Sequence, residues 1–306
     1  MEQKKGIWSS SLYNPIINKK FQISLNEGNT PLERLKFLEI ESGVEYVYAK
    51  REDKNPTGSA KDRMIAYYFS LLKSRGIREI VIPSSGNTAI SSIYYSKLAD
   101  IKVHLFIPSN LDKNKNERLH EAIKKNPNVE VIQSIKPLSS AIQFSIKNNI
   151  EILRGSNSKY SEQGYKSLGE ELYQINANAI FIPVSSGTTL SGLALKNKSQ
   201  IHAVQTSKIN TISRDFDNDF KYEEESLAKA IVARVTQRKK NVDKIIEKTR
   251  GWGWCIENKE IKQYHNILES KGINTSFEGA LSVAGFFKAL EKGYSFKKVI
   301  LLFTGK

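Results

Sequence analysis

From about residue 45 onward, the chain alternates short runs rich in β-branched residues with segments whose apolar residues recur at helical spacing. The runs typical of strands are residues 45–50, 79–82, 102–107, 129–133, 151–153, 179–184, 201–205 and 298–303. The segments typical of helices are residues 62–74, 88–99, 116–125, 138–148, 164–174, 189–196 and 278–291. This alternation predicts an α/β fold with mainly parallel sheets, covered by helices, and with sites at the carboxyl ends of the strands.

One polar and acidic stretch, residues 210–225, interrupts the alternation. It contains neither strand nor helix periodicity, and its carboxylates favour water. We therefore predict an exposed loop or irregular segment there.

The composition narrows the class of protein. The 306 residues correspond to roughly two domains. Hydrophobic residues make up 39% and charged residues 26%, which excludes collagen-like and mostly disordered chains. No apolar run reaches the roughly 18 residues of a membrane span. Residues 1–5 precede no signal-peptide core, and Cys255, the only cysteine, can form no internal disulfide, so we predict a cytoplasmic protein that does not associate with membranes.

The net charge of +15 attracts anions, which include nucleic acids and phosphorylated small molecules. No helix-turn-helix, zinc-finger or aromatic RNA-binding signature accompanies the charge, so nucleic-acid binding is not predicted as the primary role. The four histidines are scattered without short ligand spacing, and we predict no metal site.

Two strand-to-helix junctions share a design that suits an anion. Residues 84–88 read SSGNT and residues 185–189 read SSGTT. Each offers hydroxyl groups, a glycine and free backbone N–H groups at a helix start. One such loop is also typical of ordinary helix capping, whereas two loops in one α/β chain suit a ligand with two anionic ends.

Lys61 occupies a third junction, at the start of the predicted helix 62–74. The positive end of the helix macrodipole opposes protonation of an amine there, and an unprotonated amine is what Schiff-base chemistry requires. By itself this pattern is more often an exposed lysine beside an aspartate, here Asp62.

Two of these motifs resemble those of the fold type II pyridoxal-phosphate enzymes, namely NPTGSAKDR at residues 55–63 and SGNT at residues 85–88. Four further motifs, in the right order, resemble those of threonine synthases within that family. They are EGNTPL at 27–32, KRED at 50–53, EGA at 278–280 and LFTG at 302–305. The resemblance covers nearly the whole chain. It implies two open α/β domains: a large cofactor-binding domain (residues 1–50 and 150–306) and a smaller mobile domain (residues 51–149).

The resemblance also implies roles for individual residues. Lys61 would be the catalytic residue, holding pyridoxal 5'-phosphate covalently and moving protons, while Asn87 would contact the 3-oxygen of the cofactor. Thr304 would face the pyridine nitrogen, and the cofactor phosphate would be cradled by Ser185, Ser186, Gly187, Thr188 and Thr189. The substrate would contact Ser84, Ser85, Thr88 and Ser156. A neutral hydroxyl at the pyridine nitrogen favours elimination and replacement over transamination.

The reaction implied is the conversion of O-phospho-L-homoserine and water to L-threonine and phosphate, by a lyase acting on a phosphorylated amino acid. A homodimer is also expected. Three departures from the family pattern matter: Ala60 replaces an aromatic residue, the loop at 185–189 lacks a run of glycines, and Ser161 stands where threonine synthases have a phosphate-binding arginine. Arg154 or Lys159 would have to substitute for that arginine.

Two other readings stay open. One keeps the cofactor but changes the reaction to β-replacement or deamination, as in cysteine synthases or serine/threonine dehydratases. The other is a basic binding protein, or a descendant of the fold without catalysis. The presence of Lys61, Asn87 and Thr304 together speaks against loss of catalysis.

Overall fold

The computed structural model describes residues 6–10, 12, 17–111, 113–124, 126–158, 160–195 and 197–306, which form two compact units. The first unit comprises Lys61–Gly164 and the described residues up to Gly28. The second comprises Asn29–Ala60 and Tyr165–Lys306. The division of the chain into a large domain and a smaller mobile domain at residues 50 and 150 stays a prediction.

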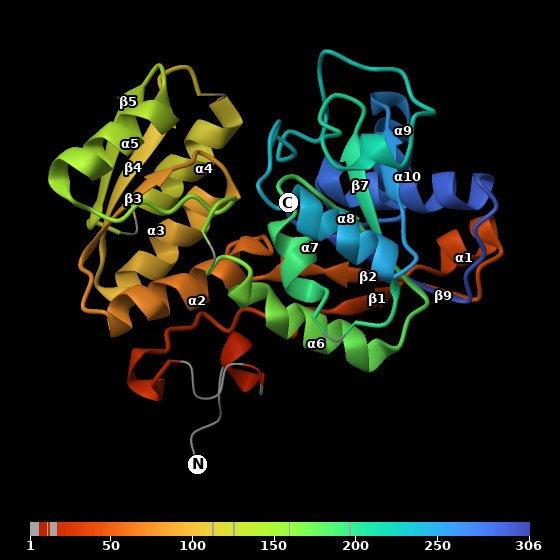
Figure 1. The fold of residues 1–306 in the computed structure, drawn as a ribbon, viewed down its shortest axis with the longest axis horizontal. Helices are drawn as coiled ribbons and strands as arrows, with labels where there is room; N and C mark the ends of the chain where they lie inside the picture. The colour runs from red at the N-terminus through yellow and green to blue at the C-terminus, as the bar shows by residue number, and fades with distance from the viewer. Residues whose placement is uncertain are drawn as a thin grey trace. The chain divides into compact units, whose positions relative to one another are not determined.

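The first unit is built on a three-stranded parallel sheet of order β3-β4-β5. Helix α5 covers one face of this sheet (Figure 1). Val81, Phe106, Ala141 and Phe144 form a small core there. Along the chain, the elements of this unit are η1 (Gly6–Ser9), η3 (Lys19–Phe21), α2 (Lys61–Ser74), β3 (Glu79–Pro83), α3 (Asn87–Ala99), β4 (Lys102–Pro108), α4 (Lys113–Ile123), β5 (Val129–Ser134) and α5 (Pro137–Asn148).

The second unit is built on a six-stranded sheet of order β1-β2-β9-β6-β7-β8, in which only β1 runs antiparallel to its neighbour. Its elements are β1 (Leu32–Arg34), α1 (Lys36–Ser42), β2 (Tyr46–Arg51), η4 (Glu52–Lys54), α6 (Lys166–Ile175), β6 (Ala179–Pro183), α7 (Thr188–Leu193), β7 (Gln200–Thr206), η6 (Ser213–Asp215), α8 (Lys239–Lys248), β8 (Gly253–Ile256), α9 (Asn258–Ser270), α10 (Phe277–Glu291) and β9 (Lys298–Phe303). The short turn η5 (Gln163–Tyr165) lies where the chain passes from the first unit to the second.

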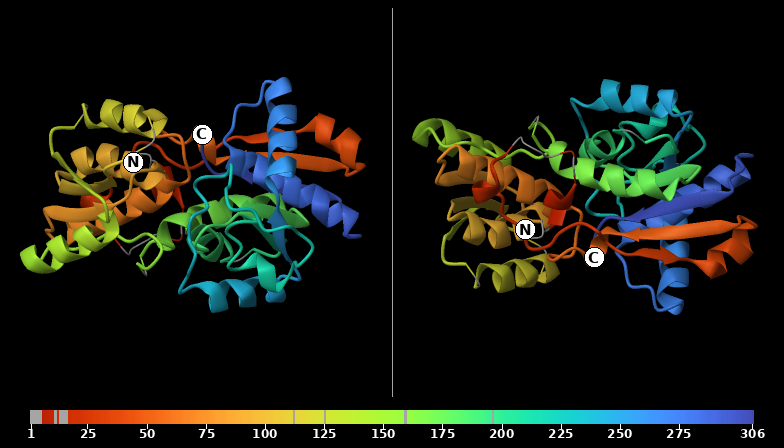
Figure 2. Two further views of the ribbon diagram at one scale, coloured as in Figure 1. Left: turned by 90° about the horizontal axis from the view of Figure 1, so that it is seen from above. Right: turned by 90° about the horizontal axis from the view of Figure 1, so that it is seen from below.

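Strand β9 shows why this sheet is covered on both faces. Val299, Leu301 and Phe303 face one apolar core with helices α9 and α10, whereas Ile300 and Leu302 face another with helices α6, α7 and α8. The two helical layers are visible on either side of the sheet in Figure 2. A continuous apolar run is what a parallel strand buried on both faces requires.

Every predicted helix and all but one of the predicted strands are present, with ends shifted by at most a few residues. The prediction of a strand at 151–153 is wrong, because Ile152 forms only an isolated bridge to Val81. Elements α1, β1, α8, β8 and α9 have no counterpart among the predicted ranges.

The acidic segment 210–225 is irregular apart from η6, as predicted, but it is not simply a solvated loop. Asp217 is buried, accepts a hydrogen bond from the Cys255 N–H (2.9 Å) and pairs with Lys288 Nζ (2.8 Å). A carboxylate that is paired and hydrogen-bonded in this way can be buried at tolerable cost. Cys255 is itself buried, and burial raises the pKa of its thiol.

None of the helices in the described part of the chain combines the length and the hydropathy that crossing a bilayer would require.

Candidate active site

The carboxyl ends of β2, β9 and β6 meet at one edge of the six-stranded sheet, and the segment that leads to Lys61 begins there. Ser59 forms an antiparallel bridge with Gly305, and the Ala60 N–H donates to the Thr304 carbonyl (3.0 Å). The residue before Lys61 is therefore tied directly to Thr304. Buried Ala60, although smaller than the aromatic residue expected by resemblance, makes this bond through its backbone.

The loop 185–189 lies at the same edge, after β6, and its last two residues begin α7. Gly187 has φ +84°, and a Cβ atom there would lie 2.5 Å from Val242 Cγ2. The Ser186 and Thr188 hydroxyl oxygens are 3.0 Å apart. This turn therefore brings two hydroxyl groups together beside a glycine without a run of glycines, a cradle that would suit a phosphate group.

Residues 230–236, which we call the strap, hold this loop in place. Ser185 Oγ accepts hydrogen bonds from the N–H groups of Val232 (3.0 Å) and Ala233 (3.2 Å). Thr236 Oγ1 donates to the Ser186 carbonyl (2.6 Å). The strap has no periodicity and no motif, so nothing in its sequence revealed this role.

In the first unit, Lys61 is the first residue of α2, as predicted. The Asp62 carboxylate accepts a hydrogen bond from Ser91 Oγ (2.6 Å), which ties the first turn of α2 to helix α3. Helix α3 begins at Asn87, one turn before Ser91. The unit thus brings the starts of the lysine helix and the asparagine helix together.

The loop before α3 and the first residues of the helix present half-buried polar groups, among them Ser84, Ser85, Asn87 and Thr88. Gly86 has an extended backbone, and a Cβ atom there would meet no protein atom within 4 Å. Neither backbone strain nor packing within the protein explains the glycine, which would leave room for a ligand to approach the backbone closely.

A second loop of this unit, residues 154–164, packs on the start of α2. A Cβ atom at Gly164 would lie 2.3 Å from the Arg63 carbonyl oxygen, and one at Gly155 would lie 3.4 Å from Met64 Cε. Ser156, predicted to bind substrate, donates its hydroxyl to Asn157 Oδ1 (2.9 Å). Lys159 lies outside the described residues.

Ser161 occupies the position where the resemblance leads us to expect an arginine. It is 0% exposed, and its hydroxyl has no hydrogen-bond partner among the described residues. Arg154, at the other end of the loop, is only half-buried.

The predicted site residues thus fall into two sets. Lys61, Asn87 and the predicted substrate-binding residues belong to the first unit, whereas Thr304 and the loop 185–189 belong to the second. Each set is assembled within its own unit, and Lys61 follows Ala60 directly at the junction between the two.

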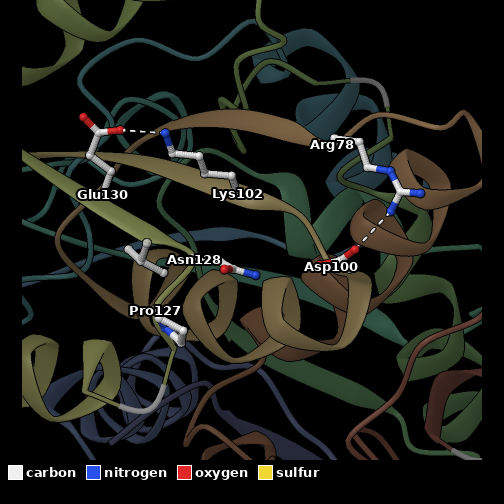
Figure 3. Close-up of a pocket in the computed structure, with 7 residues that line it drawn as sticks. Arg78, Asp100, Lys102, Pro127, Asn128 and Glu130 are labelled. Atoms are coloured by element: carbon white, nitrogen blue, oxygen red, sulfur yellow. Dashed lines mark hydrogen bonds and ion pairs between the residues drawn. The ribbon is translucent and has the colours of Figure 1, made fainter.

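A pocket of about 680 Å³ lies at the amino-terminal ends of the strands in the three-stranded sheet (Figure 3), whereas the loop before α3 lies at a carboxyl end. Its charged groups pair with one another, Arg78 with Asp100 (3.3 Å) and Lys102 with Glu130 (3.1 Å). Because these pairs leave little unbalanced charge, we do not assign the pocket to an anionic cofactor.

Comparison with known proteins identifies the family. A family model described as pyridoxal-phosphate dependent enzyme matches residues 23–305. The chain is 26% identical to a threonine synthase of Methanocaldococcus jannaschii over 311 residues, covering 94% of this chain and 76% of that protein. It is 29% identical to an O-acetylserine dependent cystathionine beta-synthase of Bacillus subtilis over 191 residues, or 58% and 61% of the two chains. The structure of maize serine racemase matches with a TM-score of 0.78 at 18% identity, over 91% of this chain and 88% of that one.

The chain belongs to the family of pyridoxal-phosphate dependent enzymes, and the predicted fold class and cofactor are confirmed. The residues present fit this cofactor. Lys61 would hold its aldehyde carbon, and the cradle at 185–189 would hold its phosphate. When bound, the cofactor supplies an electron sink for charge that develops beside the substrate amino group.

Proposed function

We propose that this chain is a threonine synthase-like lyase, which converts O-phospho-L-homoserine and water to L-threonine and phosphate. The observation that carries the proposal is the similarity to a threonine synthase along 94% of the chain. The motifs that carry Lys61, Asn87 and Thr304 in the sequence also resemble those of this family. Cysteine synthases also match the chain, but over shorter stretches.

Each residue of the proposed site has a task in this reaction. Lys61 Nζ would accept the α-proton of the substrate and return it at a later step. Asn87, Ser185, Ser186, Gly187, Thr188 and Thr189 would orient the cofactor, and Thr304 would donate a hydrogen bond to the pyridine nitrogen without protonating it. Ser84, Ser85, Thr88 and Ser156 would hold the substrate carboxylate and chain.

The substrate phosphate needs a cation, and we assign it to Arg154. Arg154 directly precedes Gly155, which packs against Met64. Met64 lies on α2, three residues after Lys61. A guanidinium fork matches phosphate geometry better than an ammonium does. The serine at 161 cannot supply that charge.

The first test uses purified, cofactor-loaded protein with O-phospho-L-homoserine. We expect phosphate release together with threonine, identified by mass spectrometry, and neither product from a Lys61→Ala variant. Arg154→Met should raise KM roughly ten-fold to a hundred-fold through loss of a charge-assisted phosphate contact. Arg78→Met is the matched control and should leave KM unchanged. It removes an exposed arginine from the pocket at the amino-terminal ends of β3, β4 and β5.

A second candidate function, β-replacement or deamination of an amino acid with a neutral leaving group, is favoured by the buried Ser161, which leaves position 161 without a cation. If the loaded protein releases no phosphate but forms a thioether from O-acetylserine and a thiol, this candidate replaces the first. A 2-oxo acid formed from serine or threonine would likewise favour deamination.

A further inference from the structure

Arg51 is the last residue of β2, and its side chain is only 5% exposed. In the register of the sheet it lies beside Phe303, the last residue of β9, and Thr304 follows directly. A buried guanidinium is costly unless its donors are satisfied, so its partners show what it does.

The guanidinium of Arg51 joins separate segments of the second unit. It forms a two-pronged contact with the Asp53 carboxylate, with Nε to Oδ1 at 2.9 Å and Nη2 to Oδ2 at 2.7 Å. Nη2 also donates to the Asn274 carbonyl (3.0 Å), and Nη1 pairs with Glu33. The guanidinium carbon lies 5.7 Å from the centre of the Phe303 ring.

Three of these contacts lie on segments that lead to the active-site edge. Asp53 begins the segment that ends at Ala60, just before Lys61. Phe303 precedes Thr304. Asn274 precedes Thr275 and Ser276, both of which donate hydrogen bonds to the Gly305 carbonyl, at 3.4 and 3.2 Å.

A second arginine, Arg34, makes the same kinds of contact away from the site. Variants of Arg34 can therefore show which effects of an Arg51 variant come from a general loss of stability. Arg34 forms a two-pronged contact with Glu39, at 2.8 and 3.0 Å, and lies 4.9 Å from the centre of the Tyr46 ring. Its side chain is 42% exposed, and these partners lie on α1 and at the start of β2, away from the carboxyl edge of the sheet.

We propose that Arg51 is a positioning residue for the cofactor. It holds the segment that leads to Lys61 and the end of β9 that carries Thr304 in one arrangement at the carboxyl edge of the sheet. The planar fork makes four contacts from three nitrogens, two to Asp53 and one each to Glu33 and the Asn274 carbonyl, whereas a lysine has three donors on a single nitrogen. The inference rests on the cofactor of the family and is independent of which amino acid is the substrate.

The test compares Arg51→Met and Arg51→Lys with the matched controls Arg34→Met and Arg34→Lys, each loaded with pyridoxal 5'-phosphate. Two properties are measured: the rate at which the visible absorption band is lost on transfer of the cofactor to a scavenger, and the visible circular dichroism per unit of absorbance. Neither requires a substrate. Thermal unfolding of the cofactor-free proteins shows how much general stability each variant has lost.

We expect release to be about ten-fold faster in Arg51→Met, and several-fold faster in Arg51→Lys, because a site held more loosely loses its geometry. The circular dichroism per unit of absorbance should fall in both variants. The Arg34 variants should match the wild type in both properties.

The proposal is overturned if the Arg51 variants release cofactor within two-fold of the Arg34 variants and keep the visible dichroism. Should Arg51→Met fail to fold, the comparison of Arg51→Lys with Arg34→Lys decides, since both variants keep their charge. Failure of the proposed lyase reaction would instead appear as absent phosphate release from a wild-type protein with a normal visible band.

Discussion

At the scale of single residues, Gly187 is a position where both the backbone conformation and a neighbouring side chain disfavour any residue but glycine. Its φ of +84° is unfavourable for other residues, and a Cβ atom would lie 2.5 Å from Val242 Cγ2. A larger residue at 187 would therefore cause both backbone strain and steric overlap with Val242. Both effects would act on the turn proposed to hold the cofactor phosphate.

We predict that Gly187→Ala weakens cofactor binding at least ten-fold and destabilises the cofactor-free protein by about 1–3 kcal/mol. Isothermal titration and chemical denaturation measure the two effects. Gly76→Ala is the control for strain alone, because Gly76 has φ +71° and its Cβ would meet nothing within 4 Å. The double variant Gly187→Ala/Val242→Ala should recover part of the loss, and no recovery would contradict the overlap argument.

At the scale of elements, the strap gives the loop 185–189 a support that comes from outside its own strand and helix. Thr236 donates to the Ser186 carbonyl and accepts a hydrogen bond from the Arg238 N–H (3.2 Å). The strap is further held at Ala230, whose N–H donates to Glu278 at the start of α10 (2.8 Å). Its position is thus fixed at both ends.

Thr236→Val keeps the shape of the side chain but removes its hydroxyl. We expect a three-fold to ten-fold loss of cofactor affinity, because the lost hydrogen bond is worth about 1 kcal/mol. Equilibrium dialysis of the cofactor is the measurement. Thr249→Val is the matched control, since Thr249 also donates to a backbone carbonyl (Ile245, 2.8 Å) and accepts a backbone N–H (Ile201, 3.2 Å), but at the end of α8. Equal losses in both variants would count against a special role of the strap.

The contrast between the strap and the helices explains how much the sequence could predict. Strands such as β6 and β9 are apolar along their length because both faces are buried, and that pattern is local. The motif positions of Lys61 and Asn87 at helix starts were likewise predictable. The support of Ser185 by residues 232–233, and the burial of Asp217 through Lys288, depend on partners far along the chain. No local pattern encodes such pairings.

Short or amphipathic elements were missed for a related reason. Strands β1 and β8 have only three and four residues, which is too few to establish a period of two. Helix α9 begins with a capping box formed by Glu257 and Glu260, a signal that was present but is easily hidden in a lysine-rich and glutamate-rich segment.

At the scale of the whole molecule, the buried His202 links stability to pH. The ring stacks on Phe181 (4.4 Å between centroids), and Trp254 Nε1 donates to its Nδ1 (3.1 Å). Burial lowers the pKa of His202 from 6.5 to about 3. The folded protein therefore keeps this ring neutral at pH values where the unfolded chain binds a proton.

We predict that the free energy of unfolding falls as the pH is lowered from 6.5 toward 3, because the unfolded state binds one more proton at this residue. The contribution of His202 approaches about 1.4 kcal/mol per pH unit within that window. Urea denaturation between pH 7 and pH 4 measures it. A His202→Phe variant should show a shallower dependence than the wild type. Parallel curves for wild type and His202→Phe would refute the assignment.

The solitary thiol of Cys255 has a practical consequence for studying such transitions. It lies inside β8, and its sulfur is 3.7 Å from the Asp217 carbonyl oxygen. A thiol-specific dye can reach this thiol only when β8, an edge strand of the sheet, detaches or the molecule unfolds. The native chain thus carries its own single-site probe of opening, and labelling kinetics in dilute denaturant would distinguish local fraying of the sheet from global unfolding without any engineered cysteine.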